Sequence, residues 1–462
     1  MENGPRRKET FSSFGSRRLS MHTVIIGAGW AGLSAAVKLG QQHHQVTVLE
    51  SARQAGGRAR SAPFADGWVD NGQHLLIGAY HQTLKLLDMI SIEETTVFNR
   101  LPLQLIMRNR SDHQDIHMQA APLPAPLHML LALTQARGLT LGERWQALRL
   151  CAALPRLKFT PSSDTNVSAV LKQYRQSARL TNELWEPLCL AIMNTPAATA
   201  SAAIFIRVLI DAFTQKRRDS DLLIPRHDLG AVIPEPAINT IHRQGGRVHL
   251  GSKVKSLLMD PGKTTPHIKA VMLNDGSTIE ADQFIIATSP HACQRLLEDH
   301  AIFTQTTTQL SQLDYAPICT VYLQYPQDVS LDKPMIGLTG TIGQWLFDRR
   351  ICEQPGLMAV VISGHGEHES LDNEILAEKI HSELATLHPH WPKPETSLVI
   401  REKRATFVCH SDVHAHRPTH QTKASNVWLA GDYTDTGYPA TLEGAVYSGI
   451  ICAENIMALP SH

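Results

Sequence analysis

The sequence contains few of the groups that cross-link a protein or bind metal ions. Its 462 residues include seven cysteines, and even the closest pair, Cys293 and Cys319, is widely separated, so no C-x-x-C motif is present. Scattered cysteines of this kind are typical of reduced, buried thiols in a cytoplasmic protein. We therefore expect a cytoplasmic location.

The chain also lacks an excess of charge of either sign. Lysine and arginine together number 43, and aspartate and glutamate together also number 43. A protein that binds nucleic-acid phosphates is expected to carry a basic excess, so this balance argues against nucleic acid as a partner. With 43% hydrophobic and 19% charged residues, most of the chain is expected to be globular.

Long apolar runs are scarce as well, and the longest uncharged one follows a basic beginning. Residues 1–20 are polar and basic, and Arg17 and Arg18 precede an uncharged run from Leu19 to Val37, which imitates an export signal. That run contains regularly spaced glycines, and no small-residue cleavage site follows it. We predict that residues 1–20 are a disordered leader, with Met21 as the alternative first residue, and we predict no transmembrane helix.

A glycine-rich turn near the beginning of the chain separates two short apolar segments. His22–Ile26 is a predicted strand, an alanine-rich helix follows to about Leu39, and Val46–Glu50 is a second predicted strand. The glycines between strand and helix have the G-x-G-x-x-G spacing of dinucleotide-binding turns, in which they allow the tight turn, the approach of a pyrophosphate and close helix packing. The predicted cofactor residues of this turn are Gly27, Gly29, Trp30, Ala31 and Gly32.

The segment after the second strand narrows the choice of dinucleotide. Glu50 stands where an acid accepts hydrogen bonds from ribose hydroxyls, and it disfavours NADP because it would repel the 2′-phosphate. Gly56, Gly57 and Arg58 then combine close backbone approach with a side chain that pairs with pyrophosphate. This segment, from Arg53, resembles the Arg-x-x-Gly-Gly-Arg extension of flavin enzymes such as amine oxidases and carotenoid desaturases, which implies FAD.

The carboxyl end has a second pattern of this kind. A predicted strand leads into Gly431 and Asp432, and it resembles the flavoprotein segment in which the acid holds the ribityl chain. The helix that opens near Thr441 and Leu442 is similar to the one whose amino-terminal dipole faces the flavin ring. We add Val254 to the predicted cofactor residues, and we predict non-covalent FAD because residues 432–441 contain no cysteine.

These patterns predict an α/β fold. The expected architecture is a Rossmann-type FAD-binding domain of the G-x-G-x-x-G and Gly-Gly-Arg type, with an inserted substrate domain made of a mixed sheet and helices. Helix-period apolar residues predict helices in Leu123–Leu157 and Asp164–Phe213, and Arg247–Leu257 and Ile268–Leu273 are predicted hairpin strands. The predicted FAD domain comprises residues 21–90, 220–300 and 420–458, and the substrate domain comprises 91–219 and 301–419.

The resemblance can be made narrower. Residues 70–80 are similar to plant-type phytoene desaturases, and the chain from Met21 onward is similar to the family of bacterial hydroxysqualene dehydroxylases. The segments that carry this similarity are Trp185–Leu188, Asn194–Pro196, Ile224–Arg226, Gln344–Arg349 and Arg404–Phe407. The resemblance implies an FAD-dependent oxidoreductase that forms squalene from hydroxysqualene, in the route to hopanoids, with upstream squalene-pathway synthases as partners.

Three other functions stay open at this point. One is a flavin desaturase that removes hydride from a polyene, and a weaker one is an amine oxidase, which would need a polar pocket. The third is a non-catalytic carrier of prenyl lipids on an FAD fold. The electron donor also stays open, because the sequence contains one dinucleotide fingerprint and hence no evident NADPH domain.

Reductive removal of an allylic hydroxyl requires an acid, and the sequence offers two candidates. His74 follows the Gly-Gly-Arg region, and Asp435 is the extra carboxylate nearest the flavin loop. A structural histidine and a turn-capping aspartate are the alternative interpretations. Tyr438 is predicted to line the substrate cavity, with core packing as its alternative.

A group of metal-binding residue types lies close together before the last predicted strand. Zinc requires fixed spacing on ordered elements, whereas this stretch is polar and includes Pro418, so we predict a solvated loop and no metal. The group consists of Cys409, His410, His414, His416 and His420.

Two apolar segments bear on membrane contact. Leu101–Met107 and Leu123–Ala136 are rich in Leu, Pro and Met and have few charges, as a buried core face would be. A triterpene substrate is insoluble in water, so an exposed apolar rim around a tunnel mouth is the alternative. Peripheral contact with the inner face of the cell membrane is therefore predicted beside the cytoplasmic location.

Overall fold

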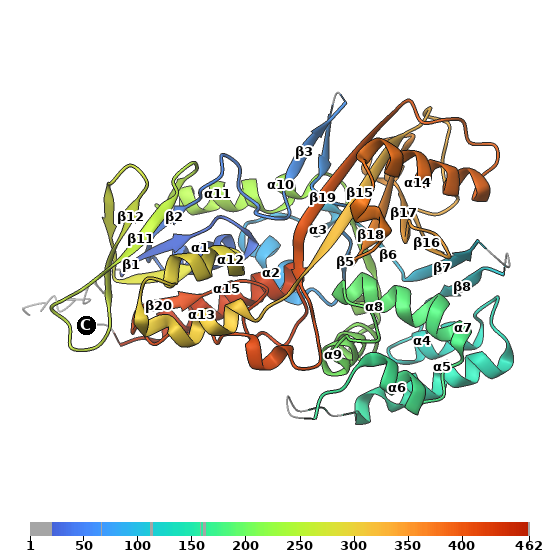
Figure 1. Ribbon diagram of the computed structural model, residues 1–462, viewed down its shortest axis with the longest axis horizontal. Coiled ribbons are helices and arrows are strands. Elements are labelled where there is room, and N and C mark those ends of the chain that lie inside the picture. The colour runs from blue at the N-terminus through green and yellow to red at the C-terminus, as the bar shows by residue number, and fades with distance from the viewer. Residues whose placement is uncertain (1–20, 66, 111–113, 158, 160–162, 461–462) are drawn as a thin grey trace, which may run out of the picture.

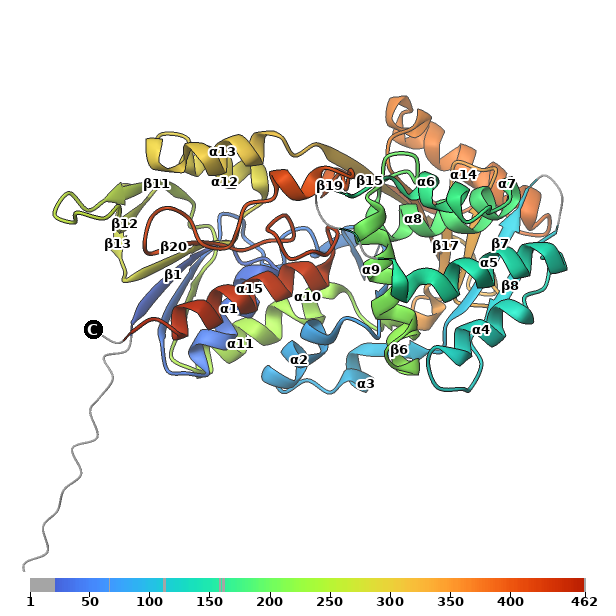
Figure 2. The ribbon, with the colours of Figure 1, turned by 90° about the horizontal axis from the view of Figure 1, so that it is seen from below.

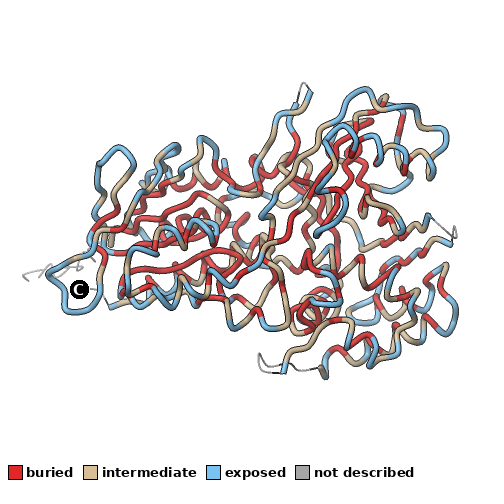
Figure 3. Tube along the Cα trace, in the orientation of Figure 1, coloured by how far each residue is buried: buried red, intermediate tan, exposed pale blue. Residues whose placement is uncertain are grey.

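The computed structural model describes residues 21–65, 67–110, 114–157, 159 and 163–460. The chain forms two lobes along its long axis, and the beginning and end of the chain, blue and red, share the left lobe of Figure 1. Green and orange segments from the middle of the chain form most of the right lobe. Buried backbone runs through the interior of both lobes, as Figure 3 shows. The predicted leader, residues 1–20, lies outside the described residues.

A five-stranded parallel sheet forms the centre of the first lobe. Both of its faces are buried, since Ile25 packs into one hydrophobic cluster while Val24 and Ile26 pack into another. The predicted strand His22–Ile26 is confirmed as β1. In sheet order the strands are β10 (Arg247–His249), β2 (Gln45–Leu49), β1 (His22–Ile26), β14 (Gln283–Ile286) and β20 (Val427–Leu429).

Two helices from opposite ends of the sequence pack together against this sheet. In α1 (Trp30–Gly40), the Ser34 hydroxyl donates a hydrogen bond to the Val446 carbonyl of α15 (Leu442–Met457) at 3.1 Å. A Cβ on Gly449 of α15 would lie 2.1 Å from the Ala31 carbonyl oxygen, so only glycine permits this approach. The contact brings the two predicted cofactor motifs together. The remaining helices of this lobe are α2 (His81–Met89), α3 (Glu94–Val97), α10 (Leu229–Val232), α11 (Pro234–Arg243), α12 (Pro290–Leu297) and α13 (Thr304–Ser311).

The prediction of one hairpin strand over Arg247–Leu257 is wrong. Residues 247–249 form β10 at the edge of the parallel sheet, and Gly251, at φ +72°, turns the chain away from it. The chain then enters an antiparallel sheet whose strands are β11 (Val254–Met259), β12 (Ile268–Leu273) and β13 (Thr278–Glu280). The alternating pattern is thus shared between two sheets, because a left-handed glycine conformation separates its halves.

A seven-stranded mixed sheet forms the core of the second lobe. Its pairs are antiparallel except that β16 and β7 are parallel, and its two longest strands run side by side toward the first lobe (Figure 1). In sheet order the strands are β19 (Thr396–Phe407), β15 (Tyr315–Gln324), β18 (Leu357–Ser363), β17 (Trp345–Asp348), β16 (Met335–Thr339), β7 (Gln104–Asn109) and β8 (Ile116–Gln119). Helix α14 (Asn373–Leu387) packs on this sheet.

Helices cover the other side of the second lobe, within both stretches where the sequence predicts them. No helix among the described residues is long and apolar enough to cross a bilayer. The helices are α4 (Leu127–Thr134), α5 (Leu141–Ala153), α6 (Val167–Gln173), α7 (Ala178–Leu180), α8 (Glu186–Met193) and α9 (Ala202–Phe213). Figure 2 shows them together at one end of the molecule.

The predicted boundary between residues 90 and 91 lies just after α2, between two strands that share a partner in one small sheet. Its strands are β5 (Leu76–Ile77), β9 (Leu222–Pro225) and β6 (Phe98–Leu101). For Leu101–Met107 the structure supports the buried core face and not the alternative of an exposed rim, because Leu105, Ile106 and Met107 are buried in β7, where the mixed sheet and its neighbours cover both faces. A hairpin of β3 (Ser61–Phe64) and β4 (Gly67–Asp70) projects from the surface (Figure 1).

Candidate active site

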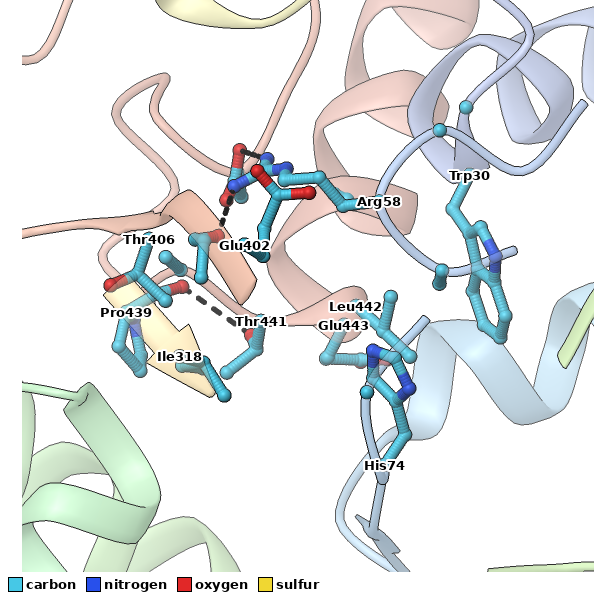
Figure 4. Close-up of a pocket in the computed structure, with 18 of the residues that line it drawn as sticks. Trp30, Arg58, His74, Ile318, Glu402, Thr406, Pro439, Thr441, Leu442 and Glu443 are labelled. Carbon is cyan, nitrogen blue, oxygen red and sulfur yellow. Dashed lines mark hydrogen bonds and ion pairs between the residues drawn. The ribbon is translucent and has the colours of Figure 1, made fainter. Parts of the chain in front are cut away.

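A cavity of about 920 Å³ lies between the two lobes and is lined by residues of both. Figure 4 shows Trp30, His74 and Leu442 on one side of it, and Ile318, Thr406 and Pro439 on the other. Nearly all the predicted cofactor residues line this cavity, although they come from distant parts of the sequence. They are Gly27, Gly29, Trp30, Ala31, Glu50, Gly56, Gly57, Arg58, Val254, Gly431, Asp432, Thr441 and Leu442.

The glycine turn before α1 leaves room for a ligand. A Cβ on Gly27 would lie 2.5 Å from the Ala287 carbonyl oxygen, and one on Gly32 would lie 2.0 Å from the Gly27 carbonyl oxygen. Gly32 therefore serves packing and does not itself line the cavity. A Cβ on Gly29 would meet nothing within 4 Å, and no side chain caps the helix there, so α1 presents free N–H groups to an anion.

Glu50 lies at the carboxyl end of β2, beside the glycine turn. Its carboxylate accepts hydrogen bonds from the backbone N–H groups of Ala28 and Ala52, both at 2.8 Å. These bonds fix the side chain at the cavity wall, and the remaining lone pairs can accept hydrogen bonds from vicinal hydroxyls.

Arg58 and Asp432 join the two predicted motifs directly. The Arg58 guanidinium donates to the Asp432 carboxylate at 2.6 Å and to the Ala405 carbonyl at 2.6 Å. Asp432 is almost fully buried, whereas the Arg58 side chain is 37% exposed, toward the cavity that it lines. Glu402, which the sequence did not single out, lines the cavity near this pair and attracts the same guanidinium.

Arg417 holds the loop that carries Asp432, and no sequence pattern pointed to it. It is 2% exposed, and its guanidinium donates to the carbonyls of Asp432 at 3.0 Å, Tyr433 at 3.3 Å and Tyr438 at 2.7 Å. It also donates to the Thr434 carbonyl and to the Thr436 hydroxyl. One buried side chain therefore fixes the shape of residues 432–438.

These features fit the nucleotide and pyrophosphate parts of FAD. The open space at Gly29, the uncapped amino terminus of α1 and the cationic Arg58 suit the phosphates, and Glu50 suits a ribose. None of the seven cysteines lines the cavity.

The other end of the cavity is apolar. One wall consists of side chains from the mixed sheet, among them Ile318, Trp345 and Phe347, and the facing wall is formed by α8 and α9. The volume of about 920 Å³ covers this apolar end and the nucleotide end together, so the lining residues, and not the volume, describe the chamber. Such a chamber favours a large apolar substrate.

A polar group interrupts this apolar wall. The Tyr438 hydroxyl lies 3.2 Å from Asp211 Oδ2, and both residues line the cavity. Arg207, one helical turn before Asp211 on α9, stacks on the Tyr438 ring at 4.3 Å from its centroid. Burial and then the negative charge of Asp211 raise the pKa of Tyr438, so its phenol stays protonated. The Asp211 side chain is 32% exposed, and its carboxylate forms an ion pair with Arg207 Nε at 3.8 Å.

The two acids suggested by the sequence lie in less suitable places. His74 lines the cavity, but burial lowers its pKa to about 4, so the imidazole is neutral near pH 7 and a poor proton donor. Asp435 is exposed and is absent from the cavity wall, since its loop turns outward and its backbone N–H donates to the Pro418 carbonyl. Neither position favours the catalytic role predicted for it.

The histidines before β20 do not converge. His420 contacts the Leu429 carbonyl through Nδ1 at 3.2 Å, while His410 forms a bridge with Ala200. Across the described part of the chain, no three His, Cys, Asp or Glu side chains are placed to hold a metal ion.

Comparison with known proteins agrees with this geometry. The sequence profile of the flavin-containing amine oxidoreductases matches residues 30–457. A hydroxysqualene dehydroxylase of Rhodopseudomonas palustris is 28% identical over 95% of this chain and 99% of its own length. A 15-cis-phytoene desaturase of Glycine max is 24% identical over 95% of this chain and 79% of its own length.

Solved structures share the fold at lower identity. An oxidoreductase from Methanosarcina mazei, 15% identical, superposes with a TM-score of 0.73 over 94% of this chain and all of its own. Cyclohexylamine oxidase from Brevibacterium oxydans, 16% identical, gives 0.64 over 95% of this chain and 98% of its own. The predicted fold class, the predicted cofactor and the resemblance drawn from the motifs are confirmed. The chain belongs to the flavin-containing amine oxidoreductases and is an FAD-dependent oxidoreductase.

Proposed function

We propose that this enzyme reduces hydroxysqualene to squalene. The observation that carries the proposal is the hydrogen-bonded Asp211–Tyr438 pair, which lies in the wall of a largely apolar chamber. A hydrocarbon needs no such group, whereas an alcohol that must lose its oxygen does. Similarity to hydroxysqualene dehydroxylases over nearly the whole chain supports the same reaction.

The protein residues supply the proton and the environment. Asp211 in its protonated form passes a proton through the Tyr438 hydroxyl to the substrate hydroxyl, the C–O bond breaks, and water leaves. The positive charge spreads over the adjacent double bond, and the apolar walls exclude water that would recapture the cation. Asp211 then takes a proton from solvent. Reduced FAD, when bound, supplies the hydride that completes the two-electron reduction.

FAD is held without a covalent bond in this proposal. The turn from Gly27 to Gly32 and the side chain of Arg58 hold the pyrophosphate, and Glu50 holds the adenosine ribose. Asp432 holds the ribityl chain, and the amino terminus of α15, at Thr441 and Leu442, faces the flavin ring.

Replacing Glu50 by Ala should weaken FAD binding by about 1.5–3 kcal/mol, or roughly 10- to 150-fold in Kd, because hydrogen bonds to a charged group are lost. Titration of apoprotein with FAD, followed by flavin fluorescence, measures the change. Glu378→Ala, at an exposed position on α14, serves as the control and should bind FAD normally. Unchanged affinity in the Glu50 variant would show that this carboxylate is not the ribose ligand.

Product analysis tests the direction of the reaction. Under anaerobic conditions, the holoenzyme with chemically reduced FAD and hydroxysqualene should yield squalene and oxidised flavin. A desaturase would instead convert squalene or phytoene to a more unsaturated polyene when its flavin is oxidised. A dehydrogenated polyene as the sole product would overturn the proposed substrate and leave the FAD site intact, and absence of flavin turnover would favour a lipid carrier.

Squalene-pathway synthases upstream are the proposed source of the substrate. The unpaired cysteines suit a reducing compartment, so we place the enzyme in the cytoplasm, at the inner face of the membrane.

A further inference from the structure

The α4–α5 region has an unusual share of exposed apolar side chains. Leu123 is 36% exposed, Leu127 53%, Leu141 80% and Trp145 68%. Single exposed leucines are common on soluble proteins, but these four lie within one short stretch of the chain. Leu141 and Trp145 are four residues apart on α5 and so project from the same face of that helix. We call these four residues the α4–α5 patch.

Helices α4 and α5 lie side by side at the outer end of the second lobe, in both Figure 1 and Figure 2. The patch is therefore at the periphery of the molecule.

The exposed charges of this stretch of the chain have one sign. Between residues 121 and 157 the basic residues are Arg137, Arg144, Arg149 and Arg156. The single acid of this stretch, Glu143, is buried and accepts hydrogen bonds from the Thr140 backbone and hydroxyl. Exposed leucine and tryptophan beside arginines are typical of helices that lie in the interface of an anionic bilayer.

The inner side of the same region contacts the wall of the cavity. His128 on α4 is buried and lies 3.1 Å from the Ser220 hydroxyl, and Ser220 lines the cavity. Just before α4, the Ala120 N–H donates to the carbonyl of Leu103, another cavity residue, at 2.8 Å. The patch and the substrate chamber are thus on opposite sides of one thin layer of structure.

We infer that the α4–α5 patch docks the enzyme on an anionic lipid bilayer, from which the apolar substrate passes into the adjacent chamber. The inference rests on the proposed function for the identity of the substrate, whereas the docking itself rests on exposure, charge and position. The patch inserts its apolar side chains among the lipids, and Arg137 and Arg156, both exposed, contact lipid phosphates.

Vesicle flotation of the holoenzyme tests the docking. Wild-type protein should float with vesicles containing phosphatidylglycerol and much less with pure phosphatidylcholine. The double variant Leu141→Gln/Trp145→Gln should bind roughly tenfold more weakly. Trp68→Gln, which alters a tryptophan that is 56% exposed on the β3–β4 hairpin, is the matched control and should bind like wild type. Arg137→Gln/Arg156→Gln should lose the preference for anionic lipid.

Substrate presented in micelles and in vesicles distinguishes failure of the docking inference from failure of the proposed function. The double variant should keep wild-type turnover of hydroxysqualene in detergent micelles and lose most turnover of hydroxysqualene embedded in vesicles. If wild type turns over micellar substrate but does not float, the docking is wrong and the proposed function stands. If the protein floats as expected but does not act on hydroxysqualene, the docking stands and the substrate is wrong. If the double variant changes only the oligomeric state, the patch is an interface between copies and the docking is overturned.

Discussion

Asp211→Asn should lower kcat for hydroxysqualene reduction by about 10²–10⁴, the contribution typical of a positioned general acid. The amide has nearly the shape of the carboxyl group but cannot deliver a proton to the Tyr438 hydroxyl 3.2 Å away. Steady-state kinetics under anaerobic conditions with reduced flavin measure the effect, and FAD content and the flavin absorption spectrum should not change.

Two further measurements separate proton transfer from positioning. In Asp211→Asn the KM for hydroxysqualene should stay near the wild-type value while kcat falls, because the amide keeps the shape of the carboxyl group and only the proton is lost. Tyr438→Phe should cause a loss of similar size, because the phenol carries the proton between Asp211 and the substrate. A kcat within threefold of wild type in Asp211→Asn would show that the acid lies elsewhere.

Arg417→Ala should weaken FAD binding at least about tenfold and lower the Tm of the apoprotein by about 5 °C. The side chain is buried and donates to four carbonyls of the Asp432–Tyr438 loop, and each acceptor left unsatisfied costs about 1–3 kcal/mol. Loss of the loop's shape would also displace Asp432, the proposed ligand of the ribityl chain. Thermal unfolding of the apoprotein and FAD titration give the two values.

Arg417→Lys should lower the FAD affinity and the Tm nearly as much, because one ammonium group cannot reach all the acceptors that the guanidinium group spans. Arg401→Ala is the matched control. Arg401 donates to the carbonyls of His368 and Leu371, which are outside the cofactor loop, so its loss should lower the Tm without changing FAD affinity. If Arg417→Ala binds FAD like wild type, the loop keeps its shape without that side chain.

The cofactor end of the site could be predicted from the sequence because its chemistry depends on local backbone conformation. The turn at Gly27–Gly32 needs glycine for reasons confined to a strand, a turn and a helix, and Asp432 follows its own strand directly. Such short-range requirements leave a recognisable spacing. The motif at each end of the chain therefore indicated FAD before any contact between them was known.

The tertiary structure alone decided what depends on contacts between distant segments. Asp211 is an ordinary helix residue until α9 packs beside the loop of Tyr438, 227 positions later, and Arg417 is one of many arginines until that loop folds around it. His74 and Asp435 were chosen by closeness in sequence, which says nothing of burial or of the direction in which a loop turns. Leu105–Met107 and Leu141 look equally apolar in the sequence, yet the mixed sheet buries the first and nothing among the described residues covers the second. Burial is a property of packing partners, and these are assigned only when the whole chain has folded.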